Sequence, residues 1–468
     1  MSHLQSVFSS ESLLAKLCRL PQPRKYWVGF SGGGDSTALL LALHESQADL
    51  PAPFEAIHFH HGLQREGDAW LEHCRRFCAQ RGIAFSSRRL ECHPVQGVSP
   101  EEQARDRRYA AIADVLGEDE MYLTAHHADD QAETLFLNLM RGSGIDGLAG
   151  IPRLRALEAG WVARPMLGVH RRELLAYLTG RGVDWITDPS NRDTRFDRNF
   201  LRQEIFPLLE SRWPGIAGRL ARTARNTRIS ARAVEAFVDR QAGHVLADSS
   251  RLPLQPLRSL CSDMRSLVLR QWLRRHELPA LPESRLNEFL DQACAAAPAN
   301  QAEVIWSGWM IKRYRQNLWL QRSKALPACP TLQWPAGTSL KLGDELGELR
   351  LEEGEVELPG SWSVRARGPG DRLQLHPDGP RRPAKDLFQS SEIPPWLRSC
   401  APVLCWDEEP CALGDWHIGA KLQAWLAVNR QTLRWRPSNP LLARLRRDAH
   451  EAVRGPSQTA DMPSDRLE

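Results

Sequence analysis

The sequence predicts an α/β protein: a doubly wound parallel sheet in the N-terminal part, followed by a helical domain and a small β-rich domain. Two observations lead to this prediction. Over residues 1–215, short apolar strand-like runs alternate with longer helical segments, which is the pattern of repeated β-α units. After Pro214 the alternation stops, and the chain becomes first helical and then rich in short strands and turns. A parallel sheet of this kind binds ligands at the carboxyl ends of its strands.

Four strands and four helices are expected in the N-terminal part. The strands are short apolar runs at residues 26–30, 54–60, 83–90 and 121–127. The helices alternate with them, at residues 37–45, 68–82, 99–116 and 129–142. Gly82 ends the second helix, whereas Ser99 as N-cap and Pro100 at the first helical position begin the third.

The domain boundaries follow from changes in composition. We expect a catalytic domain over 1–215, a mainly helical domain over 216–325 and a small β-rich domain over 336–436. The prolines between the last two are typical of a linker: Pro327, Pro330 and Pro335. Residues 449–468 lack apolar periodicity, which predicts a disordered tail.

The composition excludes several classes of protein. Of the 468 residues, 42% are hydrophobic and 25% are charged, as in ordinary globular proteins. No apolar run reaches the roughly 18 residues that a membrane span needs, and the N-terminus lacks the pattern of a secretory signal. Ten scattered cysteines without a CxxC pair suit the reducing cytoplasm, where we expect the protein to act. The net charge of +4 does not by itself indicate a nucleic-acid partner.

A glycine-rich loop follows the first expected strand and opens the first helix. It consists of Ser31, Gly32, Gly33, Gly34, Asp35 and Ser36. The glycines let the backbone approach a ligand closely, and the loop N–H groups with the helix N-terminus form an anion cradle. Ser31 and Ser36 add hydroxyl donors. A carboxylate beside bound phosphate is repulsive unless a cation joins them, so we expect Asp35 to hold Mg²⁺.

The loop differs from the common nucleotide-binding motifs. It contains no lysine, so it is not G-x-x-x-x-G-K-[ST], and it does not fit G-x-G-x-x-G. The pattern S-G-G-x-D-S resembles the pyrophosphate loop of ATP pyrophosphatases that release AMP. This resemblance implies that the loop binds ATP and that the first domain is a PP-loop catalytic domain.

A second polar cluster lies at the end of the fourth strand and the start of its helix. His126 and His127 precede Asp129, Asp130 and Glu133, and the helical spacing places the three acids on one edge. Such a cluster suits a metal or a cationic substrate. A two-metal hydrolase is a rival interpretation, but it leaves the glycine loop without a role. Capping and compensation of the helix dipole could explain Asp129 and Asp130, but not three acids together with two histidines.

The chain resembles the tRNA(Ile)-lysidine synthetases, and the resemblance is ordered along residues 28–207. Beyond the loop and the acid cluster, it is carried by His58-Phe59-His60-His61-Gly62-Leu63, Ala104-Arg105-Asp106-Arg107-Arg108-Tyr109, Arg141-Gly142-Ser143-Gly144, Arg164-Pro165-Met166-Leu167, Trp185-Ile186-Thr187-Asp188-Pro189-Ser190-Asn191 and Phe196-Asp197-Arg198-Asn199-Phe200-Leu201-Arg202. It extends weakly into 365–404. Gln64 stands where the family commonly has Arg, and Thr187 where it commonly has an acid.

The resemblance implies a reaction. The family joins L-lysine to C2 of the wobble cytidine in the CAU anticodon of tRNA(Ile), and ATP becomes AMP and pyrophosphate through an adenylated cytidine. The implied partners are therefore ATP, Mg²⁺, L-lysine and that tRNA, while a homodimer is left open. Because the wobble base must reach the active site, we expect it to leave the anticodon stack.

The resemblance also implies roles for residues. Arg108 is a candidate for contact with the ATP phosphates. Asp129, Asp130 and Glu133 are candidates for binding the lysine ammonium groups, and Asp130 or Glu133 could accept the proton. Arg198 and Arg202 are candidates for the lysine carboxylate or an RNA phosphate, and the sequence does not separate these roles.

An arginine series suggests how RNA could be held. Arg219, Arg222, Arg225, Arg228 and Arg232 recur every three or four residues on one expected helix of a tRNA-binding domain. This stripe could follow a phosphate backbone, and a solvated helix face is an equal alternative. Two other functions stay open: a PP-loop enzyme that thiolates a tRNA base, and a non-catalytic tRNA-binding protein with a degenerate nucleotide fold. The absence of CxxC argues against the first, and the intact loop argues against the second.

Overall fold

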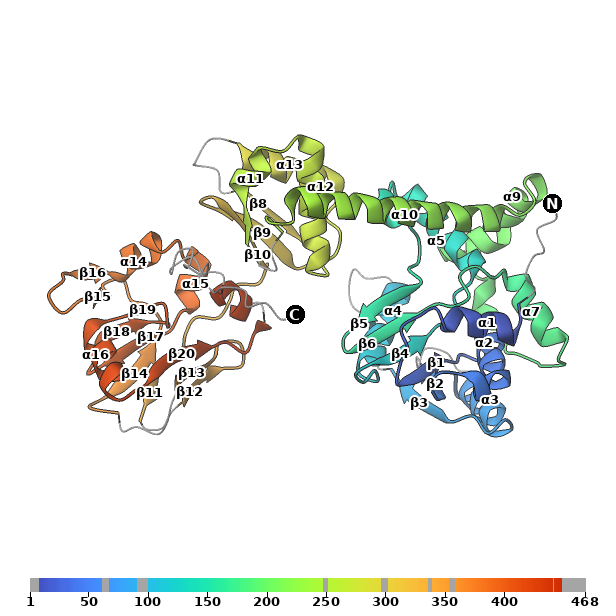
Figure 1. Ribbon diagram of the computed structural model, residues 1–468, viewed down its shortest axis with the longest axis horizontal. Coiled ribbons are helices and arrows are strands. Elements are labelled where there is room, and N and C mark those ends of the chain that lie inside the picture. The colour runs from blue at the N-terminus through green and yellow to red at the C-terminus, as the bar shows by residue number, and fades with distance from the viewer. Residues whose placement is uncertain are drawn as a thin grey trace, which may run out of the picture. The chain divides into compact units, whose positions relative to one another are not determined.

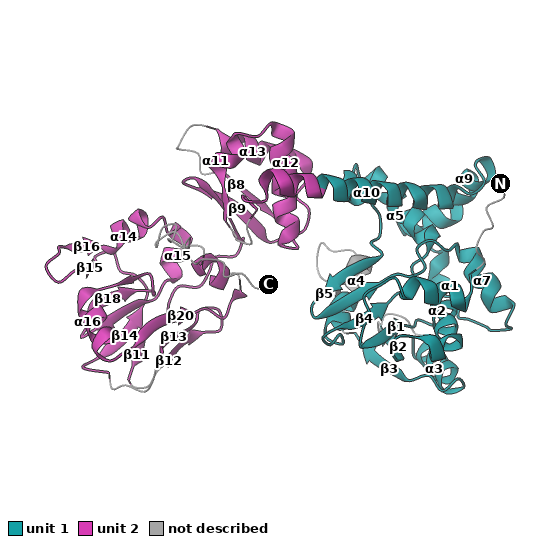
Figure 2. Ribbon diagram, in the orientation of Figure 1, with its two compact units in different colours: residues 1–234 teal, residues 235–468 magenta. Residues whose placement is uncertain are grey.

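The computed structural model describes residues 8–60, 67–90, 100–246, 251–295, 302–335, 339–352, 358–440 and 442–447, without the side chains of 100–106. Three expectations therefore lie outside it: His61–Gln64 of the second-strand motif, Ser99, and the tail at 449–468. The chain divides into two compact units, residues 1–234 and 235–468 (Figure 2).

Unit 1 is built on a six-stranded sheet (Figure 1). The strand order is β3 (Phe85–Arg89), β2 (Phe54–His60), β1 (Lys25–Gly29), β4 (Glu120–Leu123), β6 (Gly160–Ala163) and β5 (Leu154–Leu157). The first five strands are mutually parallel, and β5 joins the edge antiparallel to β6. The predicted doubly wound parallel sheet is confirmed. The β5–β6 hairpin adds two strands beyond the four that the sequence predicts.

Helices cover both faces of this sheet. One apolar core joins β1 and β4 residues to α1 (Ser10–Leu17), α2 (Gly34–Glu45), α3 (Gly67–Ala79) and α7 (Arg171–Thr179). A second core joins the opposite faces of β2, β4 and β6 to α4 (Pro100–Ala113). Successive residues of β4 alternate between the cores: Met121 and Leu123 belong to the first and Tyr122 to the second. Helix α2 packs against α1 and α7, which explains why its apolar residues do not form a single stripe.

Most other elements of unit 1 are helical. They include α5 (Ala128–Met140), α6 (Ile145–Leu148), η2 (Pro189–Arg192), α8 (Asp197–Phe200), the π-helical η3 (Leu201–Ile205), α9 (Phe206–Arg212) and the first part of α10 (Ile216–Ala242). Helix α10 begins one residue past the expected domain limit of 215, but it belongs to unit 1 as far as Val234. A domain boundary at 215 stays a prediction.

Unit 2 contains two sets of elements. The first has α11 (Leu254–Arg258), α12 (Ser262–Arg275), α13 (Glu283–Cys294) and a four-stranded sheet of β7 (Arg251–Pro253), β10 (Asn317–Arg322), β9 (Trp309–Tyr314) and β8 (Glu303–Trp306). The region expected to be mainly helical thus also carries a sheet. Its strand β7 has only three residues, too few for a recognisable alternation.

The second set is rich in strands, as predicted. One sheet has β11 (Leu332–Trp334), β14 (Trp362–Arg365), β17 (Val403–Trp406), β18 (Glu409–Leu413) and β19 (His417–Ile418), and another has β12 (Ser339–Gly343), β13 (Gly347–Glu352) and β20 (Thr432–Arg436). The remaining elements are the pair β15 (Arg372–Gln374) and β16 (Arg381–Pro383) with α14 (Ala384–Ser390), α15 (Pro395–Cys400) and α16 (Ala420–Val428). Across the described residues of both units, no helix is long and apolar enough to span a bilayer.

Candidate active site

The glycine loop between β1 and α2 is shaped by a distant segment. Gly32 has φ +80°, a left-handed conformation that favours glycine. Its carbonyl accepts a 2.9 Å hydrogen bond from the backbone N–H of Ile186, and a Cβ on Gly32 would lie 2.6 Å from Cδ1 of Ile186. A Cβ on Gly34 would lie 2.6 Å from Cδ2 of Leu175. These two glycines therefore allow close packing that forms the loop.

A cavity of about 380 Å³ lies beside the loop, and we call it the loop cavity. Its lining includes four loop residues, Ser31, Gly33, Asp35 and Ser36. The hydroxyl oxygens of Ser31 and Ser36 lie 3.0 Å apart, and Ser36 Oγ also donates to the Gly33 carbonyl at 3.0 Å. Polar side chains from β2, α4 and the β4–α5 region complete the lining: His58, Arg108, Thr124, His126 and Asp130. The structure thus brings the loop, Arg108 and Asp130 to one cavity.

Asp35 is paired with two cationic groups. Its Oδ1 accepts a hydrogen bond of 3.3 Å from Arg171 Nε, and its Oδ2 lies 3.5 Å from His127 Nε2. Burial opposes the negative charge, but His127 and Arg171 outweigh it and hold the pKa of Asp35 below its usual range. Asp35 is therefore a carboxylate near neutral pH.

Asp129 is joined to the same two residues. Its Oδ2 accepts a 2.9 Å hydrogen bond from the backbone N–H of Arg171 and lies 3.5 Å from His127 Nδ1. Asp35, His127, Asp129 and Arg171 therefore form a closed ring of contacts, in which three links join charged side chains and the fourth is made by the backbone N–H of Arg171. Burial opposes protonation of His127, but Asp129, Asp35 and Asp130 outweigh it and raise the pKa of His127 to about 10.

The neighbouring histidine has the opposite character. His126 lines the loop cavity, and its Nδ1 lies 2.6 Å from the Thr124 hydroxyl. Burial lowers the pKa of His126 to about 4, although Asp130 opposes this shift. Adjacent histidines therefore differ in charge near neutral pH, with His126 neutral and His127 protonated.

The other two acids of α5 are held by different partners. Asp130 Oδ2 accepts a 2.9 Å hydrogen bond from the backbone N–H of His127, which caps α5. Glu133 is only 1% exposed, and Arg202 donates to both of its oxygens, from Nε at 2.8 Å and from Nη2 at 3.0 Å. Arg202 Nη2 also lies 3.6 Å from Asp130 Oδ1. The three acids lie on one edge of α5, as expected, but each already has a cationic or N–H partner.

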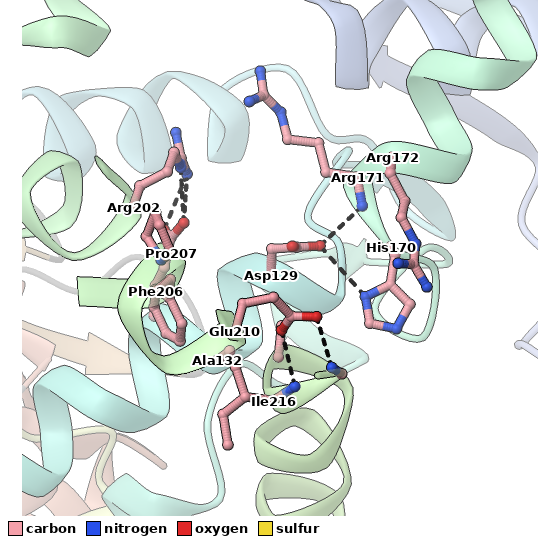
Figure 3. A pocket seen from close by; sticks show the side chains of 13 residues that line it. Asp129, Ala132, His170, Arg171, Arg172, Arg202, Phe206, Pro207, Glu210 and Ile216 are labelled. Atoms are coloured by element: carbon pink, nitrogen blue, oxygen red, sulfur yellow. Dashed lines mark hydrogen bonds and ion pairs between the residues drawn. The ribbon is translucent and has the colours of Figure 1, made fainter. Parts of the chain in front are cut away.

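A second cavity, of about 350 Å³, is lined by Asp129 and Glu133 of this cluster, and we call it the acid cavity (Figure 3). Its lining combines apolar residues such as Phe206, Pro207 and Ile216 with a polar set: Asp129, Glu133, His170, Arg171, Arg172, Arg202 and Glu210. In Figure 3, Asp129 lies between the backbone nitrogen of Arg171 and the ring of His170, whose Nδ1 is 3.8 Å away. Glu210 accepts hydrogen bonds from the N–H groups of Gly215 and Ile216, at 2.6 and 3.0 Å, and so caps α10.

Arg198 occupies a different place from Arg202. Its Nη2 donates to the Thr134 hydroxyl at 3.3 Å, and it is absent from the linings of both cavities. Sequence reasoning does not separate these two arginines, whereas the structure places Arg202 against Glu133 and Asp130, and Arg198 against Thr134. It also missed Arg171, His170 and Glu210 because they belong to no motif that marks a charged site. The His126–His127 pair was a visible signal, but the pattern could not show which histidine carries charge.

The residues around Asp35 are a partial fit to magnesium. Among the described residues, no three acids, histidines or cysteines are grouped as a metal site. Mg²⁺ is often held by one or two carboxylates together with substrate phosphates, so Asp35 at the loop is a suitable donor. In the present arrangement both of its oxygens face cations, so Mg²⁺ would share or displace the Arg171 contact.

Comparison with known proteins gives matches along both units. Three family models match: a PP-loop domain at residues 6–209, a TilS substrate binding domain at 252–319 and a TilS substrate C-terminal domain at 362–435. Among solved structures, the U34-tRNA thiolase NcsA from Methanococcus maripaludis with its [4Fe-4S] cluster aligns with a TM-score of 0.40 and 18% identity, over 46% of this chain and 77% of that one.

The similar full-length relatives share one name. The tRNA(Ile)-lysidine synthase of Xanthomonas campestris pv. campestris (strain 8004) is 37% identical over 421 residues, 89% of this chain and 96% of the relative. That of Methylococcus capsulatus is 37% identical over 400 residues, 83% of this chain and 91% of the relative. The resemblance seen in the motifs is confirmed, and the chain belongs to the tRNA(Ile)-lysidine synthase family.

Proposed function

We propose that this protein ligates L-lysine to C2 of the wobble cytidine of the CAU anticodon of tRNA(Ile). ATP is converted to AMP and pyrophosphate through an adenylated cytidine, and the product reads AUA in place of AUG. One observation carries the proposal beyond family membership. The loop cavity and the acid cavity are both lined by members of one acid cluster, with Asp130 lining the first and Glu133 the second.

The loop cavity suits the adenylation half-reaction. The cytidine O2 attacks the ATP α-phosphorus, and pyrophosphate leaves with the electrons of the broken P–O bond. The backbone N–H groups of the loop and the hydroxyls of Ser31 and Ser36 can hold the phosphates, and Arg108 on α4 adds a positive charge. We assign Asp35 as the residue that would hold Mg²⁺. When bound, the ion would offset the charge of the departing pyrophosphate.

The acid cavity suits an amino acid with two ammonium groups. Asp129 and Glu133 supply carboxylates, and Arg202 and Arg171 supply positive charge for an α-carboxylate. The lysine ε-amine attacks C2 and AMP leaves, which requires a neutral amine although the pKa of free lysine is about 10.4. Burial raises the pKa of Glu133, against the opposing effect of Arg202, which makes this carboxylate a better proton acceptor. Asp130 is the alternative acceptor, on the side of the loop cavity.

The tRNA is proposed to contact α10 and unit 2. Four arginines of the α10 series are exposed: Arg219, Arg222, Arg225 and Arg232. Arg228 differs, because it is half-buried and donates to the carbonyls of Ala149 and Gly150. We therefore assign the four exposed arginines to phosphate contacts and Arg228 to packing of the helix. Residues 216–325 and 336–436 are proposed as tRNA-contacting domains, acting in the cytoplasm. Association into a homodimer stays a prediction for sedimentation analysis.

The surroundings of the buried cysteines Cys74 and Cys78 do not favour a thiolation reaction. Transfer of sulfur needs a reactive thiolate, whereas burial raises the pKa of Cys74 and of Cys78 to about 12. Cys74 packs against Gly32 of the loop and is fully buried. Its thiol is thus a packing group in the described structure.

The proposal is tested by incubating the protein with ATP, a CAU-anticodon isoleucine tRNA transcript and individually labelled amino acids. Label from lysine alone should enter the tRNA, with stoichiometric AMP and pyrophosphate. Incorporation of another amino acid would change the assignment of the acid cavity. A lack of tRNA-dependent pyrophosphate release would contradict the enzyme assignment and favour a binding protein.

A further inference from the structure

Arg171 lines the acid cavity and, within the described part of the chain, also contacts a residue of the nucleotide loop. Its side chain lines the acid cavity, and its Nε donates to Asp35 Oδ1 at 3.3 Å. Its backbone N–H donates to Asp129 at 2.9 Å. Arg171 begins α7, so its main chain is anchored by that helix while its side chain is 39% exposed. The backbone N–H of Arg171 thus contacts Asp129 of the acid cavity, and its side chain contacts Asp35 of the loop cavity.

The guanidinium has capacity for another anion. Only Nε is bound to Asp35, and among the described residues the Nη nitrogens of Arg171 have no hydrogen-bond partner. Arg202, by contrast, uses Nε and Nη2 on Glu133 and approaches Asp130 as well. Within the acid cavity, Arg171 is thus better placed than Arg202 to accept a new carboxylate without breaking an existing bidentate pair.

The carboxylate of Asp35 can pair either with Arg171 or with the cation that accompanies a bound nucleotide. It belongs to the loop that the proposed function assigns to ATP phosphates, where a carboxylate needs a cation next to it. If Asp35 is committed to the magnesium–nucleotide complex, its contact with Arg171 weakens. The Arg171 guanidinium would then have lost its hydrogen bond to Asp35 while it still lies beside the acid cavity. Two anions, Asp35 and the α-carboxylate of an amino acid, thus compete for one arginine.

We propose that Arg171 couples the two substrate sites: nucleotide binding at Asp35 releases its guanidinium to bind the α-carboxylate of lysine. The inference rests on the proposed function for the identity of the two ligands. Arg171 is a positioning residue in this scheme, and no bond is made or broken at it. Because such coupling is reciprocal, lysine should tighten nucleotide binding by the same factor.

The test is calorimetric titration of the full chain with L-lysine, with and without Mg²⁺ and the non-hydrolysable analogue α,β-methylene-ATP. In the wild type, the analogue should tighten lysine binding by about 5-fold or more, the lower end of typical coupling. In Arg171→Ala this factor should fall to about one, the value that means no coupling. The substitution spares the backbone N–H that holds Asp129. Arg172→Ala is the matched control, because Arg172 lines the same cavity but is not among the described residues that pair with Asp35, and it should keep the coupling.

A second variant tests the direction of the effect. Asp35→Ala removes the competing carboxylate, so without any nucleotide it should bind lysine about as tightly as the wild type does with the analogue. Adding Arg171→Ala to Asp35→Ala should remove that gain, as a double-mutant cycle requires.

The results that would contradict this inference differ in what they imply for the proposed function. Lysine binding that is unaffected by the analogue in the wild type, or coupling that survives in Arg171→Ala, would overturn the inference and leave the proposed function standing. Absence of lysine binding in every state would overturn both, because the acid cavity would then not be the amino-acid site.

Discussion

Arg202 and Glu133 form a bidentate ion pair inside the acid cavity, with Nε–Oε1 at 2.8 Å and Nη2–Oε2 at 3.0 Å. Glu133 is almost fully buried, so this pairing is what makes its charge tolerable. A lysine ammonium group that binds Glu133 must share the carboxylate with Arg202 or displace it. The pair therefore connects binding of the amino acid to the position of Arg202.

Glu133→Gln is expected to impair lysine use more than adenylation. A charge-assisted hydrogen bond is worth about 1.5–3 kcal/mol, so the KM for lysine should rise, or its transfer slow, by roughly 10- to 150-fold. Formation of adenylated tRNA without lysine should persist, because the loop cavity is lined by other residues. The two half-reactions are measured separately. Glu204→Gln, an exposed acid on the same π-helical segment as Arg202, is the control. Equal loss of both steps would show that Glu133 serves the nucleotide.

Asp35→Ala is expected to abolish adenylation while the protein stays folded. Asp35 lies at the start of α2 and lines the loop cavity with a partly exposed side chain, so its removal leaves no apolar void. Pyrophosphate release should fall by at least about 100-fold, the scale of lost electrostatic stabilisation of a transition state. Circular dichroism checks the fold, and Asp49→Ala, at an exposed site after the same helix, is the control. Near-normal turnover would remove Asp35 from the phosphate site.

Gly32→Ala is expected to destabilise the loop. A side chain at φ +80° is strained by about 1–3 kcal/mol, and its Cβ would meet Ile186 at 2.6 Å. Both the free energy of unfolding and nucleotide affinity should fall. Gly33→Ala is the matched control, because Gly33 has φ −72° and its nearest neighbour would be Ser31 Oγ at 3.5 Å. Equal unfolding midpoints in urea for the two variants would contradict the steric account.

The stability of the protein is expected to fall as the pH rises into the alkaline range, because His127 loses its proton there. Its folded-state pKa of about 10 lies above the ordinary 6.5. Its contribution is therefore fully present below about 6.5 and is lost as the pH rises toward 10. The urea midpoint of the wild type should fall over this window more steeply than that of His127→Gln. His126→Gln is the control, because the pKa of His126 is lowered to about 4 and it does not titrate there. Parallel curves for wild type and His127→Gln would contradict a protonated His127.

The elements that sequence reasoning found are those with a local signal. The glycine loop, the α5 acids and the alternation of strands and helices are all visible within short windows of sequence. The Arg171–Asp35 contact joins residues 136 positions apart, so no pattern within a short window of sequence indicates it. The β5–β6 hairpin was missed because its four-residue strands are short and β5 alternates weakly in burial. The pairing of Glu133 with Arg202 likewise cannot be predicted from the sequence, although each residue is a candidate site residue by its own motif.

The most direct test of the central claim is mass spectrometry of nucleosides from a CAU-anticodon isoleucine tRNA after incubation with the protein, ATP, Mg²⁺ and L-lysine. The account predicts that the wobble cytidine gains one lysine, with the amine joined at C2, and that AMP and pyrophosphate form in equal amounts. A methionine elongator tRNA with the same anticodon should stay unmodified. An unchanged wobble cytidine in the isoleucine tRNA, or one that carries sulfur in place of lysine, would contradict the account.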